Sequence, residues 1–253
     1  MSKELQQKSH HIHPIQQALQ IPARAIVDKL FPRQKLDPES QKNLEKAAEL
    51  LEAGYGEVIP IGHYGKREFN DLYSVLFKNR EFSKRGGLLA LGAHEYYWHI
   101  TYFAKAVGVD TMPIVVYSNA RVLGLKSRSF MAGLGEFLEA SGKRLAQGGT
   151  VLAVPQGHRK SRLGEASSTL INDLLSEAEE EGAKKLAVLP VGIGLVGDTN
   201  YEDRGFHFFE RGIVTIRPPR TRAEINDITG GKPRDIERWV FDELRAAIPE
   251  NYR

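Results

Sequence analysis

The 253-residue sequence contains no cysteine, and this absence removes several kinds of chemistry at once. Disulfides, a thiolate nucleophile and any metal site with cysteine ligands are excluded, and the composition fits a cytosolic protein. Long apolar runs are missing too. None approaches the roughly 18 residues of a membrane-spanning helix, and residues 1–7 lack the apolar stretch of a secretory signal. The net charge of +3 is small, so we expect no nucleic-acid partner.

The N-terminal part of the sequence has a helical pattern. After a polar start, apolar residues recur at helical spacing over residues 15–30 and again over residues 38–53. Asp37 or Ser40 is a suitable N-cap for the second stretch. We therefore predict an N-terminal tail and helical segment over residues 1–53.

From residue 54 to residue 253, short apolar runs alternate with longer amphipathic ones. The predicted strands cover residues 58–61, 87–91, 114–117, 150–154, 186–191 and 212–216. The predicted helices cover residues 70–79, 96–107, 130–147, 167–181 and 234–247. Continuous apolar strands that alternate with helices are typical of a sheet covered on both faces. We therefore predict an α/β fold over residues 54–253, with a mixed, mostly parallel central sheet flanked by helices.

The first predicted strand ends in residues that can do chemistry, and sheets of this kind place their sites at the carboxyl ends of strands. The strand leads into Gly62-His63, and Glu68 follows five positions after the histidine. A histidine at a rigid strand end can take a proton from a substrate, and a nearby carboxylate can fix its tautomer and stabilise its charged form. Asp71 is a second candidate for that carboxylate, although its position also suits the start of the next helix or a solvated site.

Two later strands are marked in the same way. They end in Val154-Pro155-Gln156-Gly157-His158-Arg159-Lys160-Ser161 and in Leu189-Pro190-Val191-Gly192-Ile193. Proline and glycine by themselves indicate a tight turn after a buried strand, and basic residues beside it are often a solvated face. The alternative is an anion site, because a guanidinium offers a fork of donors that suits phosphate.

In this order the marks resemble the motifs of the glycerolipid acyltransferase family, whose members include glycerol-3-phosphate and lysophosphatidate acyltransferases. The family's first motif is a histidine and, after four residues, an aspartate; His63 and Glu68 stand at these positions. Its third motif, Phe-Pro-Glu-Gly-Thr-Arg-Ser, is matched at Pro155, Gly157 and Arg159.

The fourth motif of the family, an apolar strand that ends in proline with small residues after it, is matched by residues 188–193. The second motif, a glycine, a strand and an arginine, is less well kept. Its best placement is residues 115–121, with Arg121 as the counterpart of the arginine. The resemblance covers roughly residues 55–220.

The resemblance implies an acyltransferase that moves a fatty acyl group from acyl-CoA or an acyl carrier protein to a hydroxyl of a glycerol-phosphate or lysophospholipid-like acceptor. His63 would be the general base, Glu68 would orient it, and Arg159 would hold an anionic group of the acceptor. Further substrate-binding residues would be Gly157, Gln156, His158 and Arg121. Transfer would be direct, and we expect neither a metal nor another cofactor.

A lipid substrate implies a membrane surface. We therefore expect a cytoplasmic protein that is either soluble or peripheral on the membrane. The helices of residues 15–53 either dock on such a surface or pack on the sheet.

Two departures from the family pattern concern the site itself. Glu68 in place of aspartate lengthens the orienting side chain by one methylene group, and Gln156 in place of glutamate removes a negative charge. Two other functions therefore stay open. One is a non-catalytic relative that binds a lipid or an acyl carrier, and the other is a hydrolase that uses the same His63–Glu68 pair on water.

Two other motifs predict no site. The histidines of His94-Glu95-Tyr96-Tyr97-Trp98-His99 are five positions apart, whereas zinc chelation from one helix face needs four. Gly192-Ile193-Gly194-Leu195-Val196-Gly197 has the glycine spacing of a dinucleotide site, but a polar, turn-like segment follows in place of a helix.

Overall fold

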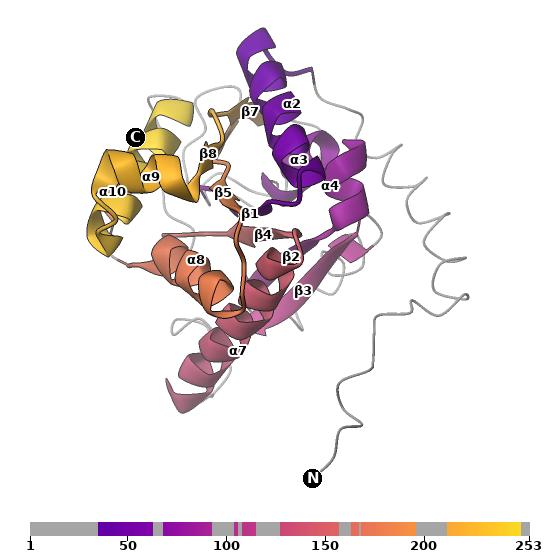
Figure 1. Ribbon diagram of the computed structural model, residues 1–253. Helices are drawn as coiled ribbons and strands as arrows, with labels where there is room; N and C mark the ends of the chain where they lie inside the picture. The colour runs from indigo at the N-terminus through magenta and orange to yellow at the C-terminus, as the bar shows by residue number, and fades with distance from the viewer. Residues whose placement is uncertain are drawn as a thin grey trace.

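The computed structural model describes residues 35–62, 68–92, 104–105, 108–114, 127–156, 163–166, 168–195 and 212–248. They form a six-stranded sheet in the order β3-β2-β4-β1-β5-β8 and a two-stranded sheet of β6 and β7 (Figure 1). The strands are β1 (Gly56–Pro60), β2 (Gly87–Gly92), β3 (Val109–Ile114), β4 (Thr150–Ala153), β5 (Leu186–Val188), β6 (Val191–Leu195), β7 (Gly212–Ile216) and β8 (Arg220–Thr221). The helices are α2 (Pro38–Glu52), α3 (Glu68–Val75), α4 (Arg80–Arg85), α7 (Ser127–Ala146), α8 (Leu170–Glu180), α9 (Arg222–Thr229) and α10 (Pro233–Ala247).

β1 lies inside the larger sheet and runs parallel to both of its neighbours, β4 and β5. β2 continues the parallel arrangement to β3 at the edge, and β8 pairs antiparallel with β5. The predicted α/β fold, with a mixed and mostly parallel central sheet flanked by helices, is therefore confirmed.

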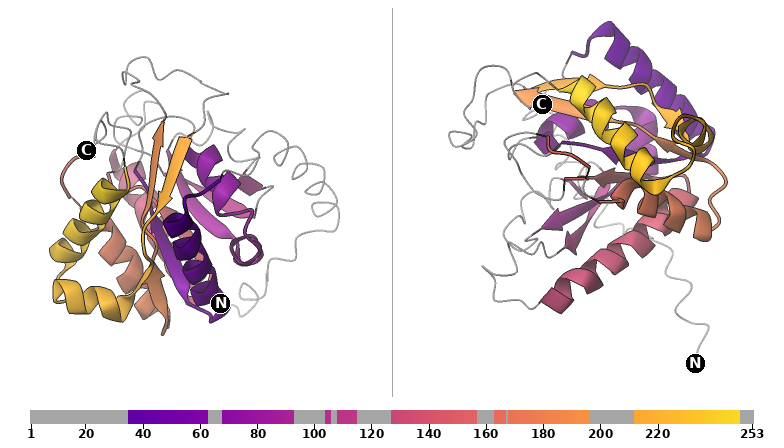
Figure 2. Two further views of the ribbon diagram at one scale, coloured as in Figure 1. Left: turned by 90° about the horizontal axis from the view of Figure 1, so that it is seen from above. Right: turned by 90° about the vertical axis from the view of Figure 1, so that its left-hand side faces the viewer.

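Helices cover both faces of this sheet (Figures 1 and 2). Successive residues of a strand point to opposite faces, so Ile59 packs with α2, α3 and α4, while Val58 packs with α7, α8 and α10. We call these two sides the α2 face and the α8 face. Each has its own cluster of fully buried apolar side chains, and the sheet between them is the rigid support for any residue at its edges.

α2 is stabilised by its own N-cap and by hydrogen bonds to β7. Of the two predicted caps, Asp37 is the N-cap: its Oδ1 accepts hydrogen bonds from the amides of Glu39 at 3.0 Å and Ser40 at 2.9 Å. The buried Asn43 donates to the Ile216 carbonyl of β7 at 2.8 Å, and the Ile216 amide donates to Ser40 Oγ at 3.0 Å. α2 thus packs on the α/β domain. The boundary after residue 53 stays a prediction, and the helix expected over residues 15–30 lies outside the described residues.

Two predicted strands differ from the observed ones. A strand was expected over residues 114–117, whereas the observed strand, β3, runs from Val109 to Ile114. β3 includes the exposed Asp110 and a proline at position 113, both of which an edge strand tolerates. The run over residues 186–191 divides into β5 and β6, which belong to different sheets. Pro190 has no amide to donate to a ladder, so the chain changes sheets there.

Three short elements were not predicted, and one predicted helix differs from the observed one at both ends. The helix expected over residues 70–79 begins earlier, at Glu68, and ends at Val75. α4 follows as a separate helix, capped by Asn79, whose side chain accepts from the Glu81 amide at 2.9 Å. α9 and β8 are too short and too polar for a periodicity signal. Of the helix expected over residues 96–107, Ala104 and Lys105 are described and are helical.

Candidate functional site

β1 carries the first marked segment to the edge of the sheet. Every residue of β1 is buried, and the chain stays buried through Ile61 and Gly62. α3 then begins at Glu68 and is anchored by Leu72 and other core residues. His63 therefore follows a rigid, buried strand and precedes an anchored helix. His63 itself and the side chain of Glu68 lie outside the described residues.

The segment that resembles the third motif follows β4, the strand beside β1. Pro60 of β1 is in register with Ala153 of β4, and the Ile61 amide donates to the Ala153 carbonyl oxygen at 2.9 Å. The two parallel strands thus end together. After β4 the chain remains buried at Pro155 and Gln156, and the predicted substrate-binding residues Gly157, His158 and Arg159 come next, outside the described part of the chain.

The segment that resembles the fourth motif lies along the other side of β1. Val58 is in register with Val188 of β5, and the Leu189 amide donates to the Val58 carbonyl oxygen at 2.9 Å. After Pro190 the chain still touches β1, because Ile61 and Val191 form a parallel bridge. β4, β1 and β5 are therefore three consecutive strands, and the three marked segments leave the sheet at the same edge.

Asp71 lies inside α3 and is buried, which corrects the expectation that it starts that helix or faces solvent. The reason is that α3 begins at Glu68, so Asp71 falls in the turn that packs on the sheet. Its carbonyl oxygen accepts a hydrogen bond from Ser74 Oγ at 2.8 Å. Asp71 is thus a buried carboxyl group on the helix that follows His63.

Gln156 is 5% exposed at the end of β4. A neutral amide is much less costly to bury than a carboxylate, so a glutamine suits this buried position. The loop after it returns to the same place, since Ser168 Oγ donates to the Pro155 carbonyl oxygen at 3.3 Å. Arg121, the remaining predicted substrate-binding residue, lies outside the described residues.

Sites of other kinds find no support in the described residues. No group of three or more histidine and acidic side chains is gathered there in a way that could hold a metal ion. Gly192 and Gly194 lie within β6, which pairs with β7, so this glycine pattern is a strand and not the turn before a helix. His94 and His99 lie outside the described ranges. No helix in the described part of the chain combines the length and apolarity needed to cross a membrane.

Sequence reasoning missed two buried acids, Glu57 in β1 and Glu237 in α10. A signal for both was present in the sequence. Glu57 directly precedes the apolar run of the first strand, and Glu237 falls in the apolar stripe of its helix with Val240, Phe241 and Leu244. An acid in such a place is either paired or shifted in its pKa.

In comparisons with known proteins, the chain matches neither a model of a protein family nor a curated protein sequence.

Proposed function

We propose that the chain is an acyltransferase. It would move a fatty acyl group from the thioester of acyl-CoA or an acyl carrier protein to a hydroxyl of a glycerol-phosphate or lysophospholipid-like acceptor. His63 is the general base of this proposal, Glu68 its orienting carboxylate and Arg159 the principal contact for an anionic group of the acceptor.

One observation carries the proposal. The strands that precede the three motif-like segments, β4, β1 and β5, are consecutive and parallel in the sheet. Segments at positions 63, 157–159 and 190–193 are far apart in sequence but leave neighbouring strand ends, where α/β proteins build their sites. A chance set of three unrelated turns would not need this order.

The proposed reaction is a direct transfer. The His63 imidazole accepts the proton of the acceptor hydroxyl while the hydroxyl oxygen attacks the thioester carbonyl carbon. The carbon–sulfur bond then breaks, and the leaving thiolate takes the proton back from the imidazolium. Backbone amides near Gly157 are suited to stabilise the oxyanion of the tetrahedral intermediate. Because the chain has no cysteine, no thiol of the protein takes part.

The decisive experiment measures free-thiol release from a long-chain acyl-CoA, with and without glycerol 3-phosphate or a lysophospholipid. His63→Ala should lower acceptor-dependent turnover by about 10²–10⁴-fold, the usual contribution of a general base. Its thermal melting should match that of the wild type, because the substitution leaves the buried residues of β1 and of α3 unchanged. A folded His63→Ala variant with full activity would show the mechanism to be wrong.

Two carboxyl groups compete for the role of orienting His63, and matched variants separate them. If Glu68 orients the imidazole, Glu68→Gln should lower kcat while Asp71→Asn changes mainly stability. The reverse pattern would assign the role to the buried Asp71. The pH profile of kcat distinguishes both from a loss of folding, because an imidazole without its carboxylate has a lower pKa.

A non-catalytic relative is the second candidate, and the buried Gln156 favours it, since the acidic residue of the family motif is replaced where the chain is tightly packed. Saturable binding of an acyl thioester without turnover on any acceptor would support this function. Fatty acid released without an acceptor would instead indicate a hydrolase that uses water in place of the hydroxyl.

A further inference from the structure

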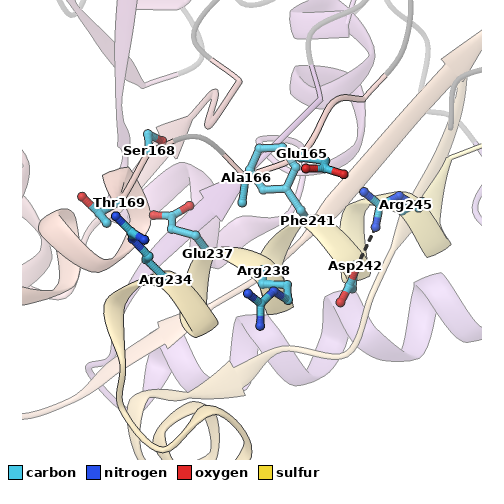
Figure 3. A pocket seen from close by; sticks show the side chains of 10 residues that line it. All are labelled: Glu165, Ala166, Ser168, Thr169, Arg234, Glu237, Arg238, Phe241, Asp242 and Arg245. Atoms are coloured by element: carbon cyan, nitrogen blue, oxygen red, sulfur yellow. Dashed lines mark hydrogen bonds and ion pairs between the residues drawn. The ribbon is translucent and has the colours of Figure 1, made fainter.

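A pocket of about 690 Å³ lies between α10 and the loop that leads into α8 (Figure 3). Its volume is within the range of small-molecule sites, about 300–1,000 Å³. α8 follows β4 and returns the chain to β5, so its N-terminus lies at the edge where β4 ends. The hydrogen bond from Ser168 to Pro155 holds the loop at this edge. The pocket is therefore close to the ends of the marked strands, but α10 lies outside the residues that carry the family resemblance.

Three arginines of α10 line this pocket. Arg234, Arg238 and Arg245 are four and seven positions apart, which places them on one side of the helix. Arg238 pairs with Asp235 at 2.9 Å and Arg245 with Asp242 at 2.6 Å. Arg234 has no ion pair or hydrogen bond within the described residues, and its side chain lines the pocket together with Thr169 (Figure 3). Unlike Arg238 and Arg245, its guanidinium is therefore available to pair with a bound anion.

Glu237 forms part of the same pocket wall although it exposes none of its surface to water. Its Oε1 accepts hydrogen bonds from the α8 amides of Ile171 and, at 3.3 Å, Asn172. It thereby caps α8, which Thr169 does not do with its own side chain. Oε2 is buried and has no hydrogen-bond partner in the described structure. A buried oxygen without a donor favours the protonated form of the carboxyl group.

We propose that this pocket binds the phosphate group of a small phosphomonoester, with Arg234 as the principal cationic contact and the charge of Glu237 setting the affinity. A guanidinium fork suits phosphate oxygens, and the volume leaves room for the organic part of an ester. The proposal goes beyond acyl transfer and can be tested without it.

The charged groups around Glu237 explain how its proton controls binding. The charged side chains that line the pocket with it are Arg234, Arg238, Arg245, Glu165 and Asp242, and Asp173 of α8 adds a negative charge nearby. Within the described residues, α9 and β6, which also pack on α10, place no charged side chain in the pocket wall. Burial raises the pKa of Glu237 to about 7, against the effect of the two amide hydrogen bonds. Below that pH Glu237 is protonated and the pocket loses one negative charge, so an anion binds more tightly.

Calorimetric titration with inorganic sulfate and with methyl phosphate, a phosphomonoester that has no hydroxyl to accept an acyl group, tests the site. Sulfate keeps its charge around neutrality, so its affinity reports the protein alone. We expect it to fall several-fold from one pH unit below to one unit above the pKa of about 7. Glu237→Gln, which keeps an acceptor for the α8 amides, should bind sulfate equally well at both pH values. A pH dependence that survives in this variant would overturn the role of Glu237.

The cationic contact is tested by charge reversal. Arg234→Glu should weaken both probes by about tenfold or more, as the loss of a charge-assisted contact predicts. Lys232→Glu is the matched control, since it makes the same charge change two residues away on an exposed position that does not line the pocket. Arg159→Ala should leave sulfate binding unchanged, which separates this pocket from the acceptor contact of the proposed acyl transfer. Equal affinities for Arg234→Glu and Lys232→Glu, or no saturable binding by the wild type, would overturn the proposal.

Discussion

Glu57 and Glu237 are fully buried acids on opposite faces of the central sheet, and their carboxyl groups differ in their partners. Glu57 of β1 points to the α2 face, as Ile59 does two positions later, and neither of its oxygens has a hydrogen-bond partner in the described structure. Glu237 lies on the α8 face and gives one oxygen to two amides of α8. Burial raises the pKa of both groups, that of Glu57 well above its usual value and that of Glu237 to about 7.

The difference shows what the first turn of a helix does to a buried acid. Amides at a helix start have no partner in the helix, so they stabilise a carboxylate that faces them. This effect partly offsets the cost of burying the charge on Glu237, and its proton is exchanged near neutrality. Glu57 has no such donors, so burial alone acts and favours the neutral acid. Glu237 can therefore respond to pH near neutrality, whereas Glu57 is a polar residue held inside an apolar layer.

The largest expected effect is that of Glu237→Gln on the pH dependence of the unfolding free energy. The pKa of Glu237 is higher in the folded chain than its unfolded value of 4.5. Its stabilising contribution is therefore complete below that value and is lost as the pH rises through about 7. Relative to the variant, the wild type should lose about 3 kcal/mol between these limits. Urea unfolding of both proteins below and above this window measures the difference, and an equal difference at both ends would contradict the role of burial.

Glu57→Met should stabilise the protein, because methionine fills a similar volume without a buried oxygen that lacks a partner. We expect a gain of about 2 kcal/mol near neutral pH, the usual cost of such a group. The gain should increase as the pH rises, since the raised pKa makes ionisation of Glu57 in the folded chain unfavourable. Glu52→Met on the exposed end of α2 is the control and should change little. A less stable Glu57→Met protein would mean that Glu57 has a partner after all.

The sequence was sufficient to predict the class of the fold and the strand ends that carry chemical residues. Their adjacency could not be predicted, because the order β4-β1-β5 depends on how the connecting helices cross the sheet. The division at Pro190 was missed because the apolar run continues through it, although its two halves pair with different strands. The burial of Glu57 and the hydrogen bonds of Glu237 depend on contacts between residues distant in sequence. Glu237 reaches Ile171, which lies 66 positions earlier in the chain.

Gly192→Ala should disturb the α8 face while leaving the α2 face unchanged. A Cβ at Gly192 would lie 2.3 Å from the Ala247 carbonyl oxygen, so the end of α10 must move away from β6. We expect a loss of about 1–2 kcal/mol in unfolding free energy. Because α10 carries Glu237, the pH dependence tied to that residue should also change. Gly135→Ala, in α7 with no atom within 4 Å of the added carbon, is the control and should not destabilise. A loss of stability with an unchanged pH dependence would show that α10 moves without its first turns.

The smallest effect should come from Asp37, an acid whose pKa is shifted in the other direction. Hydrogen bonds from Ser40 lower the pKa of Asp37 below its usual value of 3.8, so its contribution is present above that value and is lost as the pH falls through the lower, folded value. Asp37→Ala should therefore cost about 1 kcal/mol at neutral pH, as the loss of an N-cap does. The cost should shrink in acid, where Asp37 is protonated. Asp37→Asn keeps a capping oxygen and should cost less at either pH, as judged from urea midpoints. An equal cost for both variants would mean that the charge of Asp37, rather than its hydrogen bonds, stabilises α2. The sign of each pH dependence in this chain follows from the larger of two effects on the acid: hydrogen-bond donors lower the pKa of Asp37, whereas loss of water raises the pKa of Glu57 and, against two donors, that of Glu237.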